Sequence, residues 1–312
     1  MKKIFWAGLL VVLASCQGQA PAEKSEAPSA AKKLVVGFSQ CTFEDPWRIN
    51  MNREMEDAAA QHPELKLIIA NGENKNAKQV ADVENFIVKQ VDLLIISPRE
   101  SAPLTPVVEK AHDAGIPVIV LDRALVGEKY TSFIGASNLA IGKAAGEYVA
   151  EKLGGKGKIV EIEGILGATP TQERRDGFHE AVARYPNLQV IYQQPADYKR
   201  SPAIQVMQNA LSAYPEIQAV YAHNDEMAIG AYLAAKAEGR EKQMLFVGID
   251  GQGEAVKMIR GGLLQATFVY PNGSREAIAN GWKLLHGESI PRKIQLETVR
   301  VTQSEAPDYP GF

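Results

Sequence analysis

The side chains with the clearest potential for chemistry follow the apolar run of residues 220–222. Four polar residues, 223–226, come directly after it, and an apolar pattern with helical spacing then resumes. This order predicts a strand that leads into a helix. Ligands of open α/β sheets bind outside the carboxyl ends of the strands, where Asn224 and Asp225 would lie. The alternative is that Asn224 or Asp225 only caps the next helix.

The elements that must position these residues alternate between short β-branched runs and amphipathic segments. The expected strands cover residues 33–38, 66–70, 92–97 and 117–121, and then 158–162, 188–192, 218–222 and 244–249. Such an alternation gives parallel strands that are joined by right-handed crossovers, with helices on both faces. The sequence therefore predicts an α/β fold with two doubly wound parallel-sheet domains.

Polar and aromatic residues follow most of the expected strands, and one crevice could collect them. Carboxylates and amides accept hydrogen bonds from hydroxyl groups, whereas arginine donates them. An aromatic ring such as Trp47 or Tyr198 can cover the apolar C–H face of a sugar. The combination is suited to a polyhydroxylated ligand.

Three motifs resemble those of periplasmic sugar-binding proteins of the ribose/galactose type. They are Asn-Asp-Glu-Met at residues 224–227 and the segments 116–123 and 246–251. The resemblance covers roughly residues 34–301, and the segments 36–40 and 271–272 match the galactofuranose-binding branch. It implies two domains joined by a hinge of three crossings, which close around a sugar.

The resemblance also implies a set of ligand-binding residues. Asn224 takes the position of the family's amide, and this assigns Asp225 to the helix cap. Arg174 matches the galactofuranose branch, whereas the ribose branch uses the position of Gln172. The implied ligand-binding residues are Gln40, Trp47, Arg48, Arg99, Asp122, Arg123, Asn138, Thr169, Arg174, Tyr198, Asn224 and Asp250.

Arg99 departs from the galactofuranose pattern, which has uncharged residues at this point and at Glu100. A fourth arginine in the crevice would favour an acidic or phosphorylated sugar over a neutral one. The alternative is that Arg99 pairs with Glu100, Glu44 or Asp45 at the rim of the crevice.

The N-terminus carries a processing signal. Lys2 and Lys3 precede the apolar run 4–13, which is too short to span a bilayer, and Leu-Ala-Ser-Cys ends at Cys16. This resembles a bacterial lipoprotein signal and implies cleavage before Cys16, whose thiol and amino group carry acyl chains. The alternative is an ordinary secretory signal. Residues 17–32, rich in Ala, Pro, Ser, Glu and Lys, are expected to form a flexible linker.

The expected organisation is a signal peptide over residues 1–16, a linker over 17–32 and two domains. The N-terminal domain takes residues 33–136 and 271–295, and the C-terminal domain takes 137–270 and 296–312. The protein would sit at the periplasmic or extracellular face of a membrane and present a monosaccharide to an ABC transporter. The alternative partners are a chemoreceptor or a sensor kinase.

Other functional classes lack support. The net charge of −3 over 312 residues gives no excess of basic residues that would attract nucleic acid. Neither a Gly-x-Gly-x-x-Gly motif nor a phosphate loop is present, and the five histidines lack metal-ligand spacing. We therefore expect no catalytic residue, cofactor or metal ion, although His223, Asp225 and Glu226 leave a carbohydrate-acting enzyme as an alternative. A sugar-sensing repressor would need a helix-turn-helix where the signal and linker stand. Cys41 is expected to pack in the core.

Overall fold

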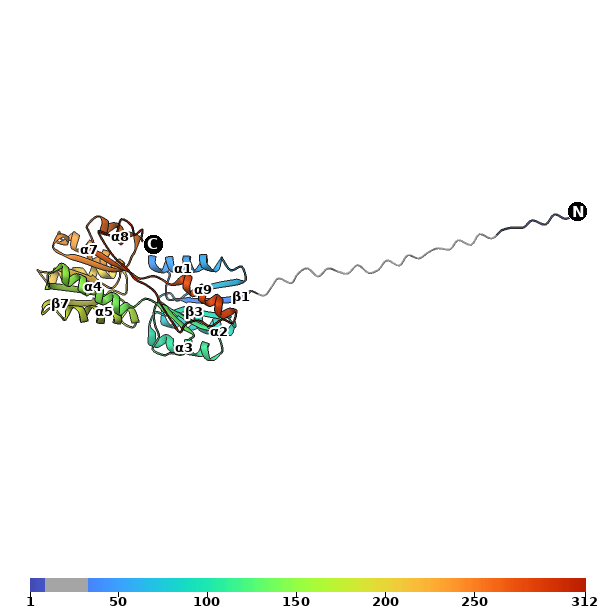
Figure 1. Cartoon of the computed structure of the whole chain (residues 1–312), viewed down its shortest axis with the longest axis horizontal. Helices are drawn as coiled ribbons and strands as arrows, with labels where there is room; N and C mark the ends of the chain where they lie inside the picture. Colours follow the sequence, from blue (N-terminus) through green and yellow to red (C-terminus); the bar gives the residue numbers. More distant parts are fainter. Residues whose placement is uncertain (9–32) are drawn as a thin grey trace. The chain divides into compact units, whose positions relative to one another are not determined.

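The computed structural model describes residues 1–8 and 33–312 (Figure 1). Residues 1–8 contain no helix or strand. Cys16 and the linker expected at residues 17–32 lie outside the described residues. Residues 33–312 form a unit of their own, which is built around two sheets. Within the described residues, no helix is both long and apolar enough to cross a membrane.

The first sheet has the strand order β11-β5-β4-β3-β1-β2, and its neighbouring strands are parallel. Helices α1 and α9 pack together on one face, and α2 and α3 pack on the other (Figure 1). The elements of this first lobe are β1 (Leu34–Gln40), α1 (Pro46–Ala59), β2 (Leu65–Asn71), α2 (Asn76–Val88), β3 (Leu93–Ser97), α3 (Ser101–Asp113), β4 (Val118–Leu121), β5 (Ser132–Gly135), α9 (Ser274–Leu285) and β11 (Lys293–Gln295).

The second sheet has the order β12-β10-β9-β8-β6-β7. Its strands are parallel except for β12, which pairs antiparallel with β10. The elements of this second lobe are α4 (Asn138–Lys152), β6 (Lys156–Glu163), α5 (Thr169–Val182), β7 (Asn187–Pro195), α6 (Arg200–Ala213), β8 (Ala219–Ala222), α7 (Asp225–Ala237), η1 (Glu241–Gln243), β9 (Leu245–Asp250), α8 (Gly253–Arg260), β10 (Ala266–Val269) and β12 (Arg300–Thr302).

Strand β8 shows why the runs are apolar on both faces. Ala219 and Tyr221 belong to the core beneath α4 and α5, whereas Val220 and Ala222 belong to the core beneath α6 and α7. Tyr221 stacks on Phe178 of α5 with ring centroids 4.0 Å apart. A parallel strand that is covered on both sides needs such a continuous apolar sequence.

The predicted fold class is confirmed: two doubly wound α/β lobes are joined by crossings of the chain. Within residues 33–312 the chain passes between the sheets three times, after β5, after β10 and after β11. All the expected strands are present, and their ends differ from the expectation by at most three residues. The short strands β5, β10, β11 and β12 were missed. The domain boundaries at residues 136/137, 270/271 and 295/296 stay a prediction.

Helices α4 and α5 approach each other so closely that glycine is required at the contact. A Cβ atom on Gly142 would lie 2.2 Å from the carbonyl oxygen of Arg174, and one on Gly177 would lie 2.1 Å from that of Leu139. Because these neighbours are backbone atoms, neither can move aside cheaply. The contact therefore also fixes the segment that carries Arg174.

We expect Gly142→Ala to lower the free energy of unfolding by about 1–3 kcal/mol, because the added methyl group would overpack this contact. Urea denaturation would measure the loss. Gly261→Ala is the control, since its Cβ would meet no atom closer than 3.5 Å. Equal losses in the two variants would contradict the proposed role of the close approach.

Candidate ligand-binding site

A cavity of about 30 Å³ lies between the carboxyl ends of the strands of the two sheets. Both lobes contribute to it. It is lined by Asp45, Trp47, Arg48, Asp122, Arg123, Pro170, Arg174, Tyr198, Asn224, Asp250 and Tyr270. A space of this size holds only a few water molecules, so a larger ligand requires the lobes or side chains to move.

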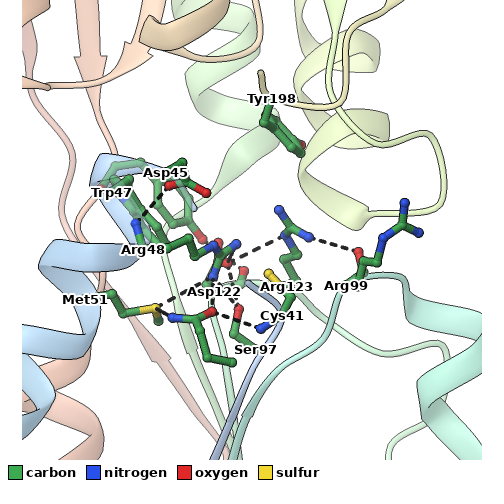
Figure 2. Close-up of polar contacts among 12 residues, drawn as sticks. Cys41, Asp45, Trp47, Arg48, Met51, Ser97, Arg99, Asp122, Arg123 and Tyr198 are labelled. Atoms are coloured by element: carbon green, nitrogen blue, oxygen red, sulfur yellow. Dashed lines mark hydrogen bonds and ion pairs between the residues drawn. The ribbon is translucent and has the colours of Figure 1, made fainter. Parts of the chain in front are cut away.

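Asp122, at the end of β4, organises the first-lobe half of the cavity (Figure 2). Its Oδ2 atom accepts hydrogen bonds from Arg48 Nη2 at 2.7 Å and from Ser97 Oγ at 2.9 Å. The same oxygen lies 3.7 Å from Arg123 Nε. One carboxylate thus holds two guanidinium groups next to each other.

Each arginine of the cavity lies against an aromatic ring. The guanidinium carbon of Arg48 is 4.6 Å from the ring centroid of Trp47, that of Arg123 is 5.2 Å from Tyr198, and that of Arg174 is 5.0 Å from Tyr270. The attraction between a cation and the face of a ring restricts the guanidinium plane. The cavity therefore presents donors in fixed directions beside apolar ring surface.

Arg174, on α5, is held from the second lobe. Its Nε atom donates to Asn138 Oδ1 at 2.9 Å, and its Nη1 atom donates to the carbonyl oxygen of His223 at 2.5 Å. Nη1 is also 3.9 Å from Asp250 Oδ1. His223 is itself buried, and its Nε2 atom contacts Glu161 Oε1 at 3.0 Å. His223 is thus a core residue that supports Arg174 through its backbone.

Asn224 caps α7: its Oδ1 atom accepts a hydrogen bond from Met227 N at 3.0 Å. Its Nδ2 atom donates to the carbonyl oxygen of Tyr198 at 3.2 Å, and the side chain also lines the cavity. The prediction that Asp225 is the cap was wrong. The reason is local geometry, because the extended backbone of the cap belongs to Asn224 and Asp225 is already helical.

Asp225 instead supports the turn behind Asp250. Its Oδ2 atom accepts from Gly251 N at 2.9 Å, Gln252 N at 2.8 Å and Thr267 Oγ1 at 3.0 Å. Burial raises the pKa of Asp225 to about 7, against the effect of these hydrogen bonds. Burial also raises the pKa of Asp250, which the charge of Arg174 opposes.

Three residues of the cavity have positive φ angles: 67° at Asp122, 63° at Tyr198 and 127° at Asp250. Residues other than glycine rarely take this backbone conformation, which costs on the order of 1–3 kcal/mol for each residue. Such strain is typical of functional sites, where the surrounding structure enforces it.

Four of the expected ligand-binding residues do not line the cavity: Gln40, Arg99, Asn138 and Thr169. Gln40 lies behind Arg48 and accepts from its Nη1 atom at 3.0 Å, while Asn138 holds Arg174. Thr169 Oγ1 accepts from Ala124 N at 2.9 Å and so links the two lobes.

Arg99 pairs with Glu100, as the alternative interpretation held. Its Nε atom also donates to Asn74 Oδ1 at 3.0 Å. Figure 2 shows this side chain pointing away from Asp122, while the backbone carbonyl of Arg99 accepts from Arg123 Nη1 at 2.9 Å. The fourth guanidinium group therefore stands apart from the other three.

The sequence missed three lining residues: Asp45, Pro170 and Tyr270. Asp45 caps α1, since its Oδ1 atom accepts from Arg48 N at 2.8 Å, and burial raises its pKa. Asp before Pro-Trp is a recognisable helix start. Tyr270 follows the unexpected strand β10, and its hydroxyl donates to the carbonyl oxygen of Asp122 at 3.0 Å.

The family model described as a periplasmic binding protein domain matches residues 36–289. The chain belongs to the periplasmic binding protein family. This periplasmic binding protein is 34% identical to the ribose import binding protein RbsB of Bacillus subtilis over 297 residues, which cover 94% of the chain and 96% of the relative. It is 33% identical to the galactofuranose-binding protein YtfQ of Escherichia coli over 301 residues, with 93% and 92% covered.

The similarity to a solved structure supports the same family assignment. The fructose-binding periplasmic domain of a hybrid two-component system is 41% identical, with a TM-score of 0.86 over 88% of this chain and 92% of that one. The family expected from the motifs is therefore confirmed. Within the residues that the structure describes, His, Cys, Asp and Glu side chains form no group of three that could hold a metal ion.

We expect the raised pKa of Asp225 to make the periplasmic binding protein less stable as pH rises. Between the ordinary value of 3.8 and about 7, the folded state holds a proton on this group that the unfolded state has lost. The free energy of unfolding should therefore fall by up to about 1.4 kcal/mol per pH unit over this window. Asp225→Asn should remove this contribution, as urea denaturation at several pH values would show.

Asp57→Asn, at an exposed position of α1, is the matched control and should leave the pH profile unchanged. Parallel profiles for the wild type and Asp225→Asn would rule out the predicted proton uptake.

Proposed function

We propose that this protein captures a neutral monosaccharide between its two lobes and presents it to an ABC transporter. The observation that carries the proposal is the equal number of arginine and aspartate side chains that line the cavity. Three arginines and three aspartates line it, at Arg48, Arg123, Arg174, Asp45, Asp122 and Asp250, so fixed donors and acceptors are matched in number. Adjacent sugar hydroxyls both donate and accept, and each could bridge such a pair.

The aromatic rings support the same ligand class. Trp47, Tyr198 and Tyr270 line the cavity beside the charged groups and offer surface for the C–H face of a sugar. The pairing of Arg99 with Glu100 removes the extra cation that an acidic or phosphorylated sugar would use. Relatives named for ribose and galactofuranose support a pentose or hexose as the ligand.

The three crossings would act as a hinge. The lobes touch through Ser101 N and the carbonyl oxygen of Gly167 at 3.0 Å, and through Lys199 Nζ and Glu44 Oε2 at 2.8 Å. Because the closed cavity is only about 30 Å³, entry of a sugar requires these contacts to open. A bound sugar that touches both lobes would then favour closure.

A second candidate function is ligand sensing for a sensor kinase or chemoreceptor. The similarity to the fructose-binding domain of a hybrid two-component system favours it. The two functions share the sugar site and differ in the membrane partner. Loss of sugar uptake on deletion of the gene would support transport, whereas loss of a transcriptional or chemotactic response with normal uptake would support sensing.

We expect a thermal-shift panel of D-ribose, D-galactose, D-fructose and L-arabinose to identify a ligand. A sugar at about 100 times its dissociation constant stabilises the folded state by roughly 2.7 kcal/mol. It should also reduce the radius of gyration in solution scattering, because the lobes close. If no neutral sugar raises the melting temperature, the proposed function is wrong.

Asn224→Asp would then test the site, because aspartate keeps the oxygen that caps α7 and removes the amide donor. Loss of one buried hydrogen-bonding partner costs about 1–3 kcal/mol, so calorimetry should show the dissociation constant rising by roughly 5- to 150-fold. Asn209→Asp, on the exposed face of α6, should bind as the wild type does. Equal affinities for all three proteins would exclude Asn224 from the site.

We also propose that acyl chains on Cys16 anchor the protein to a membrane at the periplasmic or extracellular face. Cys16→Ser should move it from the membrane fraction to the soluble fraction and abolish labelling with a palmitate analogue. Cys41→Ser is the control, since Cys41 is the other cysteine of the chain and is buried in the loop that follows β1. Membrane-bound, labelled Cys16→Ser protein would contradict the anchor.

A further inference from the structure

A second cavity, of about 260 Å³, adjoins the candidate site. The two cavities share Asp45, Arg123 and Tyr198 as their common wall. In Figure 2, Tyr198 lies above Arg123, and Asp45 lies to the left of both. A group attached to a ligand in the first cavity would reach the second by passing these three side chains.

The second cavity lies away from the three crossings. Its walls come from the loop after β1, from Asn74 after β2 and from residues 197–200 after β7. Strands β2 and β7 are edge strands, whereas the chain crosses between the lobes near β5, β10, β11 and β12 at the opposite edges. The second cavity therefore lies on the side where the lobes would separate, and it would admit a longer ligand when they open.

The size of the second cavity allows such a ligand. Small-molecule sites usually measure about 300–1,000 Å³. The first cavity, at about 30 Å³, is far below this range, and the two cavities together approach its lower end. A cavity needs about 10–15 Å³ to hold one water molecule, so the second cavity has far more room than any single hydroxyl group requires.

The charges of the second cavity favour an uncharged occupant. Lys199 pairs with Glu44 at 2.8 Å, and Arg200 pairs with Glu226 at 2.8 Å. Arg123 is bound to the carbonyl oxygen of Arg99. The lining carboxylates, at Glu44, Asp45, Asp197 and Glu226, outnumber the lining cations by one. An anionic group would meet paired cations and a net negative wall, whereas hydroxyl groups would find acceptors.

We infer that the second cavity is a subsite for a further neutral, hydroxyl-rich unit, so that this protein binds a disaccharide or glycoside as well as a monosaccharide. The inference rests on the proposed sugar-binding function. Tyr198 lines both cavities and so lies at the boundary between the two units, while Thr42 and Asn74 offer polar contacts to the outer one.

Calorimetry with matched probes tests this subsite. The probes are D-galactose with galactobiose, D-fructose with inulobiose, and D-ribose with a disaccharide of two ribofuranosyl units. For the sugar that binds, the subsite predicts that the extended probe binds within tenfold of the monosaccharide. If the monosaccharide binds and the extended probe has a dissociation constant more than tenfold higher, the inference is overturned and the proposed function stands. If no probe of either kind binds, the proposed function itself is overturned.

Two variants narrow the test. Thr42→Phe would fill the second cavity and should weaken the extended probe at least tenfold, with the monosaccharide bound within twofold of the wild type. Asp197→Gly removes a lining carboxylate at a residue whose φ of 54° suits glycine, and should weaken only the extended probe, by about three- to tenfold. Monosaccharide binding shows in each case that the variant is folded.

Ser212→Phe, at an exposed position of α6, is the control for added bulk and should leave both affinities unchanged. Equal weakening of both probes by Thr42→Phe, or no weakening of the extended probe by either variant, would overturn the subsite.

Discussion

The cavity between the lobes depends on three buried guanidinium groups, whose charges must be compensated by nearby partners. Arg48, Arg123 and Arg174 are only 3%, 6% and 4% exposed. A buried charge without partners costs several kcal/mol, so each group needs a carboxylate, a carbonyl or a ring at the correct distance. The ends of β4, β8 and β9 supply these partners, which explains why so many polar residues gather at the carboxyl edges of two otherwise apolar sheets.

The partners are arranged so that the lobes can move apart. Arg48 is held by Gln40, Ser97 and Asp122, all in the first lobe. Arg174 is held by Asn138 and His223 in the second. Separation of the lobes would therefore leave each arginine with its own partners. It would mainly break contacts between an arginine and an aromatic ring, such as that of Arg123 with Tyr198. A binding protein needs this arrangement, because its lobes must separate without leaving a buried charge unpaired.

The fold was predictable because parallel strands covered on both faces produce long apolar runs that stand out in the sequence. The short strands β5, β10, β11 and β12 were not predicted, because they lie at or next to the sheet edges and are defined by pairing with a neighbour more than by their own pattern. In the site, Trp47, Arg48, Asp122, Arg123, Arg174, Tyr198, Asn224 and Asp250 were expected and do line one cavity. Tyr270 was missed together with its strand, and Asp45 was missed because its cap position explains it without a ligand.

The positive φ angles of Asp122, Tyr198 and Asp250 have a consequence for how this chain responds to selection. Glycine would relax the backbone at each position. At Asp122, however, it would also remove the carboxylate that compensates the buried guanidinium groups of Arg48 and Arg123, which costs several kcal/mol. Each such change would also delete a wall of the cavity. Selection for stability and selection for recognition therefore act in the same direction at Asp122, and the strained backbone is retained because the buried arginines need its carboxylate.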